Sequence, residues 1–299
     1  MKKKRSFNSE SFGDRLLMAI IYISLTLVLV MTFYPFFYSI VLSFNESVDT
    51  MKGGVYFFPR AFTLDNYIYF FKDGGLLNSI WISVARTVVG TVTGVMFTAA
   101  VAYALSFKHL MFKKVYMILI IISMYFSGGL IPYFFTLKQL GLINSFWVYI
   151  IPALMNSFFV LIAISFFSDL PFSLYESAKI DGAKDLKIFI KIILPISKPL
   201  LATLGLFIAV GQWNNWMDVV FFVQDKDLKT LSYMMIDLIN SSQTPMQVSA
   251  QSAMAMANNI PPFTLQITAM VIAVFPIAIL YPFVQKHFVQ GVTIGAVKG

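Results

Sequence analysis

Side chains that commonly carry covalent chemistry are scarce in this sequence. It has no cysteine, and its only histidines are His109 and His287. These counts exclude a thiolate metal site and a cysteine nucleophile, and two isolated histidines build neither a zinc motif nor a His-based triad. The pattern G-x-x-x-x-G-K-[ST], whose backbone cradles nucleotide phosphates, does not occur either. We therefore expect no catalytic residue, no bound metal and no cofactor in this chain.

The segment 169–199 has the clearest pattern of polar and apolar residues. Ser173 and Glu176 have the spacing of a capping box, which predicts that a helix starts after Pro171. Gly182 predicts a flexible or left-handed turn at the end of that helix.

A second helix is predicted directly after this turn, and Pro195 and Pro199 should end it. Its apolar face would hold Leu186, Phe189, Ile190, Ile193 and Leu194, with Lys184, Lys187 and Lys191 on another face. A helix–turn–helix of this kind is either a docking element for a partner or an amphipathic element that rests on lipid headgroups.

Polar and aromatic residues interrupt one apolar stretch in a way that suits a sugar. Hydroxyl groups of a sugar bind polar side chains, and its C–H faces pack on aromatic rings. Both kinds of group occur in the run Gln212, Trp213, Asn214, Asn215 and Trp216. Tyr133 is a further but weaker candidate for contact with the sugar. The alternative is an interfacial aromatic belt. On a helix these five residues cannot all face one lumen.

Two further features lie in the apolar stretch from Ser79 to Phe107. Arg86 is a charge inside this stretch, and we expect it to snorkel outward to the headgroups rather than to line a pathway. Small residues at four-residue spacing predict close packing of this helix against a neighbour; they are Gly90, Gly94, Thr98 and Ala102.

The elements that must position these residues are membrane helices. Of the 299 residues 58% are hydrophobic and only 12% are charged, about half the charge of a soluble domain. Six apolar stretches are each long enough to cross a bilayer, which predicts an all-α integral membrane protein with about six spans. They are Leu16–Phe44, Ser79–Phe107, Val115–Leu137, Asn144–Phe167, Leu200–Val223 and Phe263–Val284.

Basic residues give the expected orientation. Fifteen of the 22 Lys and Arg residues fall in the segments on the N-terminal side of the membrane, which predicts that both termini are cytoplasmic. The expected organisation is a tail over 1–15, a permease domain over 16–285 and a tail over 286–299. The net charge of +8 sits in short blocks between apolar runs, so we expect lipid rather than nucleic acid as its partner.

The residues from Glu176 to Ala183, with Phe189, Ile192 and Pro195 downstream, resemble the EAA loop of bacterial ABC importer permeases. The triplet Asp181-Gly182-Ala183 and the tail 288–299 are similar to the carbohydrate-uptake branch, and most of all to the maltose-permease G-type subunits and to permeases for lipoprotein-associated or aldouronate-type oligosaccharide uptake.

This resemblance implies that the loop inserts into a groove on a separate ATPase. Carried over residue by residue, Glu176 would be the acidic contact, Ala178 would permit close approach, and Gly182 would make the turn. Ser177 replaces the family's first alanine, and Asp181 precedes the glycine.

The implied assembly lies in the bacterial cytoplasmic membrane. It contains a second homologous permease subunit, two copies of the ATPase, which bind the ATP and magnesium, and an extracytoplasmic sugar-binding protein. The resemblance implies that the substrate is a carbohydrate, with an oligosaccharide favoured over a single sugar unit. The alternatives are an ion-gradient-driven secondary transporter, which would need intramembrane carboxylates or inverted repeats, and a membrane-embedded enzyme.

Overall fold

The computed structural model describes residues 12–72, 74–243, 261 and 263–279, and within these ranges the regular elements are helical. They begin with α1 (Phe12–Ser43), α2 (Ser47–Met51), α3 (Asp65–Lys72), α4 (Gly74–Ser106), α5 (Lys113–Tyr125), α6 (Leu130–Gln139), the 3-10 helix η1 (Phe146–Tyr149) and α7 (Ser157–Ser168). They continue with α8 (Ser173–Ile180), α9 (Asp185–Ile188), the π-helix η2 (Phe189–Ile193), α10 (Leu194–Ile196), α11 (Lys198–Asn214), α12 (Met217–Phe222), the 3-10 helix η3 (Lys226–Leu228), α13 (Leu231–Gln243) and the helix Phe263–Ile279.

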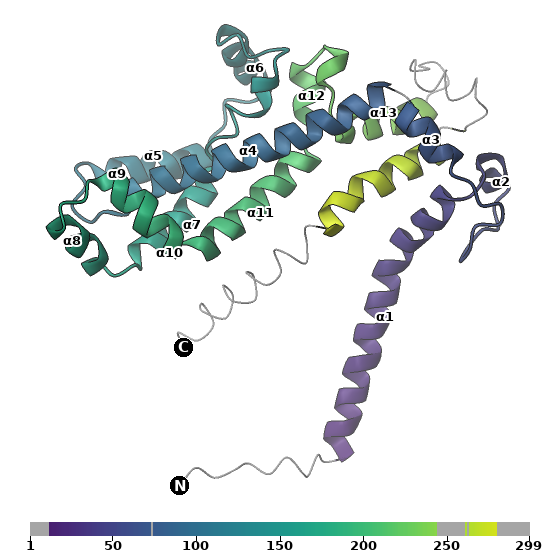
Figure 1. The fold of residues 1–299 in the computed structure, drawn as a ribbon, viewed down its shortest axis with the longest axis horizontal. Helices are drawn as coiled ribbons and strands as arrows, with labels where there is room; N and C mark the ends of the chain where they lie inside the picture. The colour runs from purple at the N-terminus through teal and green to yellow at the C-terminus, as the bar shows by residue number, and fades with distance from the viewer. Residues whose placement is uncertain (1–11, 73, 244–260, 262, 280–299) are drawn as a thin grey trace.

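The long helix α4 is the central element of the fold. It runs beside α7 and α11, with α8, α9 and α10 gathered at one of its ends and α3 and α13 at the other (Figure 1). The predicted small-residue packing of α4 is confirmed. A Cβ atom added at Gly90 would lie 2.8 Å from the Gln212 side-chain nitrogen, and Thr98 and Ala102 are buried.

Helix α1 stands apart from the other helices along most of its length (Figure 1). It has 32 residues, enough to cross a ~30 Å hydrocarbon layer at about 1.5 Å per residue. Most of its apolar side chains are exposed in the isolated chain. This surface therefore needs lipid or another membrane helix to cover it.

Two of the described helices, α1 and α4, are each long and apolar enough to cross a membrane, and the number rises to five if each of three bent helix pairs is one span. The third predicted stretch, Val115–Leu137, is broken between α5 and α6, which meet at 117°. Gly129 adopts a φ of 84° at this break, a conformation that few residues other than glycine tolerate.

The fourth and fifth predicted stretches are also less regular than their composition indicates. Regular α-helix in the fourth begins only at Ser157, where the Asn156 side chain caps α7. The fifth is interrupted after Asn214, because Asn215 takes an extended conformation before α12 begins. The last stretch is helical over Phe263–Ile279, and its remaining residues lie outside the described ranges.

Candidate functional site

The turn at Gly182 ends α8 with two backbone hydrogen bonds. The Gly182 N–H donates to the Lys179 carbonyl at 3.0 Å, and the Ala183 N–H donates to the Ala178 carbonyl at 2.9 Å, which is the Schellman pattern. Gly182 has a φ of 75°, and no atom lies within 4 Å of the position of an added Cβ. The predicted left-handed turn is confirmed, and backbone conformation rather than crowding is what requires glycine here.

The start of α8 differs from the prediction, because Ser173 does not cap the helix and the predicted capping box is wrong. Phe172 is the N-cap residue, has helical backbone angles, and makes no side-chain cap. Ser173 is therefore already inside the first turn, where it cannot take the extended conformation that capping requires. Glu176 is exposed, and among the described residues its carboxylate has no hydrogen-bond or ion-pair partner.

Three side chains join α8 to α9 across the turn. Asp185 accepts a hydrogen bond of 2.9 Å from the Tyr175 hydroxyl, and its carboxylate lies 2.8 Å from the Lys179 ammonium. The pKa of Asp185 lies below its ordinary value because Lys179, and after it Tyr175, hydrogen-bond the carboxylate. The same contact with Asp185 raises the pKa of Lys179. We refer to Tyr175, Lys179 and Asp185 as the clasp.

The second helix of the segment is less uniform than predicted. It ends at Ile196, between Pro195 and Pro199 as predicted, but the chain first passes from α9 through the π-helix η2 into α10, and it then bends by 82° before α11. Pro195 has no N–H, so one carbonyl of the preceding turn lacks its usual hydrogen-bond donor. The wider hydrogen-bond spacing of a π-helix such as η2 accommodates this loss. Leu186 and Ile190 are exposed, at 69% and 50%, so they do not share the buried face of Phe189 and Ile193.

A series of aromatic contacts links α8 to α4. The Tyr175 ring meets Phe107 with centroids 5.1 Å apart, and Phe107 meets Tyr103 at 5.1 Å. Tyr103 also stacks on Phe189 of η2, with ring centroids 5.1 Å apart. Direct side-chain contacts therefore connect α8 to the end of the central helix.

The predicted docking residues divide between two sides of this segment. Glu176, Ser177, Asp181 and Gly182 are exposed, whereas Ala178 is buried against the core of α4, α7 and α9. Ile180 lies 87% exposed beside them. We refer to Glu176, Ser177, Ile180 and Asp181 as the outer face of α8. The partners within the clasp were missed from the sequence, although the i, i+4 spacing of Tyr175 and Lys179 was a signal for them.

A second polar site lies where α11 breaks. Arg86 on α4 donates to the Gln212 side-chain oxygen at 2.7 Å and to the Asn215 carbonyl at 3.0 Å, and it forms an ion pair with Asp218. Its side chain is only 1% exposed. The expectation that Arg86 snorkels outward is therefore wrong, since the unwound backbone after Asn214 and the Asp218 carboxylate offer it partners inside the protein.

Tyr149 completes this polar site. The Arg86 guanidinium carbon lies 4.4 Å from the centre of the Tyr149 ring, within the range of a cation–π contact. The Tyr149 carbonyl accepts from Gln212 at 3.2 Å, and its hydroxyl donates to the Leu228 carbonyl at 2.6 Å. The site thus ties together α4, η1, the break in α11 and η3.

The run from Gln212 to Trp216 does not converge on one cavity. Gln212 and Asn215 line a cavity of about 400 Å³ together with Arg86 and Asn156. Trp213 instead points away from it, where its indole N–H donates to the Ala273 carbonyl at 3.1 Å.

The other residues proposed for sugar contact lie outside that cavity. Asn214 is exposed and donates to the Val210 carbonyl at 3.0 Å, and Trp216 is half-buried. Tyr133 packs on Phe222 with centroids 5.5 Å apart. Within the described ranges, no group of three or more His, Asp or Glu side chains could hold a metal ion.

Comparisons with known proteins agree on one class of protein. The chain is 39% identical to Protein LplC of Bacillus subtilis over 90% of both chains. It is 36% identical to the polygalacturonan/rhamnogalacturonan transport system permease protein YtcP of the same organism, over 99% of this chain and 100% of that one. A crystal structure of a bacterial ABC transporter involved in the import of the acidic polysaccharide alginate matches with a TM-score of 0.86 and 27% identity, over 94% of this chain and 99% of that chain. No family model matches the sequence.

Proposed function

The chain belongs to the permease subunits of carbohydrate ABC importers, and we propose that it forms half of a translocation pathway for an oligosaccharide. It is a transport subunit and not itself an enzyme. The partner ATPase, as two copies below the membrane, binds ATP and magnesium and hydrolyses the nucleotide. A second, homologous permease subunit supplies the other half of the pathway, and an extracytoplasmic sugar-binding protein delivers the substrate.

The proposed topology has six spans with both termini in the cytoplasm, a tail over 1–15, the permease domain over 16–285 and a tail over 286–299. The distribution of basic residues supports this orientation. The exposed apolar surface of α1 is suited to lipid and to the second permease subunit. The coupling segment, residues 169–199, would then lie at the cytoplasmic face between spans four and five.

The outer face of α8 is the proposed contact with the ATPase. One observation carries this proposal: Ile180 is 87% exposed directly before the turn at Gly182, beside the unpaired carboxylate of Glu176. A single isoleucine exposed to this extent, next to an acidic side chain, suits a partner groove that is apolar inside and basic at its rim. Ser177 and Asp181 lie on the same face and would contact the groove's edge.

The clasp and the aromatic series are proposed to transmit the motion of the ATPase. Asp185 holds α9 to α8 through Tyr175 and Lys179, so the two helices would move as one unit. Tyr175 then presses on Phe107 at the end of α4. Because α4 packs along both α7 and α11, a displacement at its end reaches the walls of the pathway.

The cavity beside Arg86 is the proposed sugar-contacting part of this subunit. Gln212, Asn215 and Asn156 give it amide groups, which bind sugar hydroxyls as donors and acceptors. Arg86 contributes no net charge there, because it is paired with Asp218. Trp213, Asn214, Trp216 and Tyr133 lie outside this cavity, and we propose for them at most a contact elsewhere along the pathway.

The test is reconstitution of the complex in proteoliposomes with its binding protein. Uptake of the labelled oligosaccharide should require ATP and should not respond to an imposed proton or sodium gradient. The chain alone should neither bind nor hydrolyse ATP. Gradient-driven uptake by the isolated chain would contradict the proposal and favour a secondary transporter.

A further inference from the structure

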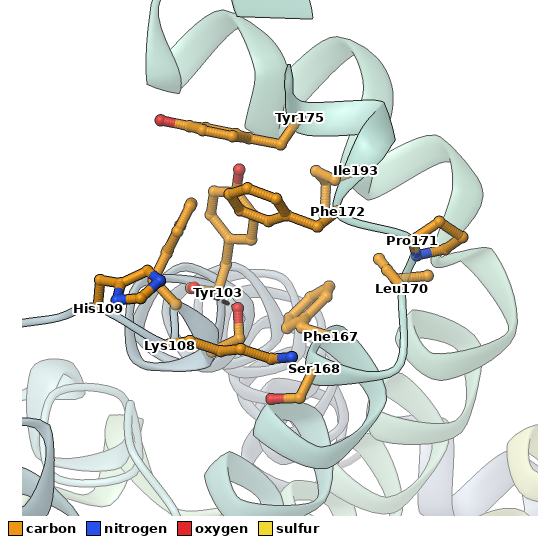
Figure 2. Close-up of a pocket in the computed structure, with 12 residues that line it drawn as sticks. Tyr103, Lys108, His109, Phe167, Ser168, Leu170, Pro171, Phe172, Tyr175 and Ile193 are labelled. Atoms are coloured by element: carbon orange, nitrogen blue, oxygen red, sulfur yellow. Dashed lines mark hydrogen bonds between the residues drawn. The ribbon is translucent and has the colours of Figure 1, made fainter. Parts of the chain in front are cut away.

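A cavity of about 390 Å³ separates the coupling segment from the ends of α4 and α7 (Figure 2). Its size falls within the roughly 300–1,000 Å³ that is common for small-ligand sites. Aromatic side chains form much of its wall, and polar groups lie on opposite sides of it. Among the lining residues that Figure 2 labels are Tyr103, Lys108, His109, Phe167, Phe172 and Tyr175.

The charges around the cavity favour an anion. The ammonium of Lys108 lines it together with the imidazole of His109, and no acidic side chain is among the described residues that do so. Figure 2 shows Lys108 extending along the foot of the cavity toward Ser168, with His109 to one side. Asp185, which lies beyond Tyr175, is already paired within the clasp.

The end of α4 would ordinarily repel an anion, because its last carbonyl groups carry partial negative charge. Lys113 covers two of these groups, with its ammonium 3.2 Å from the carbonyl oxygens of Ser106 and Phe107. The cavity is therefore shielded from the unfavourable end of the helix dipole.

The Tyr103 hydroxyl supplies a hydrogen-bond donor. It is buried and has no hydrogen-bond partner in the described part of the chain, and Figure 2 shows it directed toward the side of the cavity that Tyr175 closes. A buried hydroxyl without a partner is unfavourable. A ligand oxygen placed in the cavity would satisfy it.

The loop that carries Lys108 and His109 has the character of a membrane-interface segment. Met111 and Phe112 are 73% and 67% exposed, and Lys113 and Lys114 follow them directly. Phe112 has a φ of 58°, which is rare for a bulky residue, and it is the N-cap residue of α5. Exposed apolar side chains next to lysines are typical of segments that lie in the headgroup layer.

We propose that this cavity binds the headgroup of an anionic phospholipid. The ammonium of Lys108 and the imidazole of His109 face the phosphate, the Tyr103 hydroxyl donates to one of its oxygens, and Phe172 and Phe112 lie beside the acyl chains. The bound lipid joins α4 to α8 and so stabilises the coupling segment against the membrane helices. This site does not depend on the assignment of the outer face of α8 to the ATPase.

The test uses the whole transporter complex, purified through a tag on this chain, and native mass spectrometry of retained lipid. The probes are phosphatidylglycerol, phosphatidylcholine and inorganic phosphate. Lys108→Gln removes a charge from the cavity, and Tyr103→Phe removes the hydroxyl and keeps the ring. Lys138→Gln, at the exposed end of α6, is the matched control for the loss of one lysine charge.

We expect phosphatidylglycerol to be retained in preference to phosphatidylcholine. Its affinity should fall about tenfold in Lys108→Gln and in Tyr103→Phe, as for the loss of one hydrogen bond to a charged group, and should be unchanged in Lys138→Gln. Equal retention of both lipids, or equal affinity in all variants, would overturn the proposal. Binding of inorganic phosphate that is lost in Lys108→Gln, without any preference for phosphatidylglycerol, would also overturn the lipid assignment.

Discussion

Tyr175 and Asp185 are joined by a hydrogen bond of 2.9 Å across the left-handed turn at Gly182. They lie ten positions apart in the chain, and the bond ties α8 to α9. The ring that carries the hydroxyl also packs on Phe107, which directly follows α4. One side chain therefore holds the shape of the coupling segment and connects it to the membrane helices.

The first prediction separates these two tasks of Tyr175. Tyr175→Phe removes the hydrogen bond and keeps the contact with Phe107, so oligosaccharide uptake should fall only slightly. Tyr175→Ala removes both, and uptake per ATP hydrolysed should fall several-fold because motion of α8 no longer reaches α4. The measurement is the ratio of sugar transported to ATP hydrolysed in proteoliposomes. Equal ratios in the two variants would show that the aromatic series carries no motion.

The second prediction concerns the pH dependence of the clasp. The pKa of Asp185 is lowered and that of Lys179 is raised. The contribution of Asp185 to the stability of the clasp is therefore fully present above the ordinary pKa of an aspartate. It is lost only as the pH falls through the lowered pKa. The contribution of Lys179 to the same stability is lost only as the pH rises through the raised pKa of its ammonium group. Asp185→Asn should consequently reduce coupling by the same factor at every pH near neutrality. A defect that grows or vanishes between mildly acidic and mildly alkaline pH would contradict this.

A third prediction concerns the ion pair between Arg86, which is buried, and Asp218, which is partly exposed. Asp218→Ala leaves the guanidinium, 1% exposed, without its anion, and removing one partner of a buried pair costs about 3–5 kcal/mol. The double variant Arg86→Met/Asp218→Ala should be less destabilised than Asp218→Ala alone, because no buried charge remains. Thermal unfolding of the purified complex measures both. The single variant Arg86→Met completes the comparison, and a double variant that loses the sum of the two single effects would indicate that the residues do not interact.

The fourth prediction compares two glycines with nearly the same backbone. Gly182 and Gly53 have φ of 75° and 73°, and at both an added Cβ has open space. Valine at either position forces a branched residue into the left-handed region, at a cost of roughly 1–3 kcal/mol. Gly182→Val should abolish coupling, Gly182→Asn should largely retain it, because asparagine tolerates this conformation, and Gly53→Val should leave uptake per inserted molecule unchanged. Loss of uptake in Gly53→Val to the same degree would show that strain alone explains the effect.

The sequence predicted features that depend on neighbouring residues and failed where distant residues decide. The left-handed turn at Gly182 was predictable because it depends mainly on the presence of a glycine at one position. The ion pair of Arg86 could not be inferred in this way, because Asp218 lies far along the chain and meets Arg86 only through the break in α11. Whether the Arg86 side chain extends to the lipid headgroups or points into the protein depended on that partner, Asp218.

Local signals were also misleading where two of them competed. The capping-box spacing of Ser173 and Glu176 was outweighed by helical turns that already begin at Pro171 and Phe172. The end of the second helix between Pro195 and Pro199 was predicted correctly, but the π-helix η2 directly before Pro195 was not. The number of spans was likewise predicted from length alone, which does not show the 117° bend between α5 and α6.

The most direct test of the proposed coupling is the amount of ATPase subunit that copurifies with the Glu176→Ala variant at matched expression. Glu176 is exposed on the outer face of α8, and Asp169→Ala is the control, since it removes an exposed acidic side chain from the same segment outside that face. We predict normal membrane insertion of both variants, with a several-fold loss of copurified ATPase and of uptake in Glu176→Ala only. Normal copurification and normal uptake in Glu176→Ala would contradict the assignment of α8 as the contact with the ATPase.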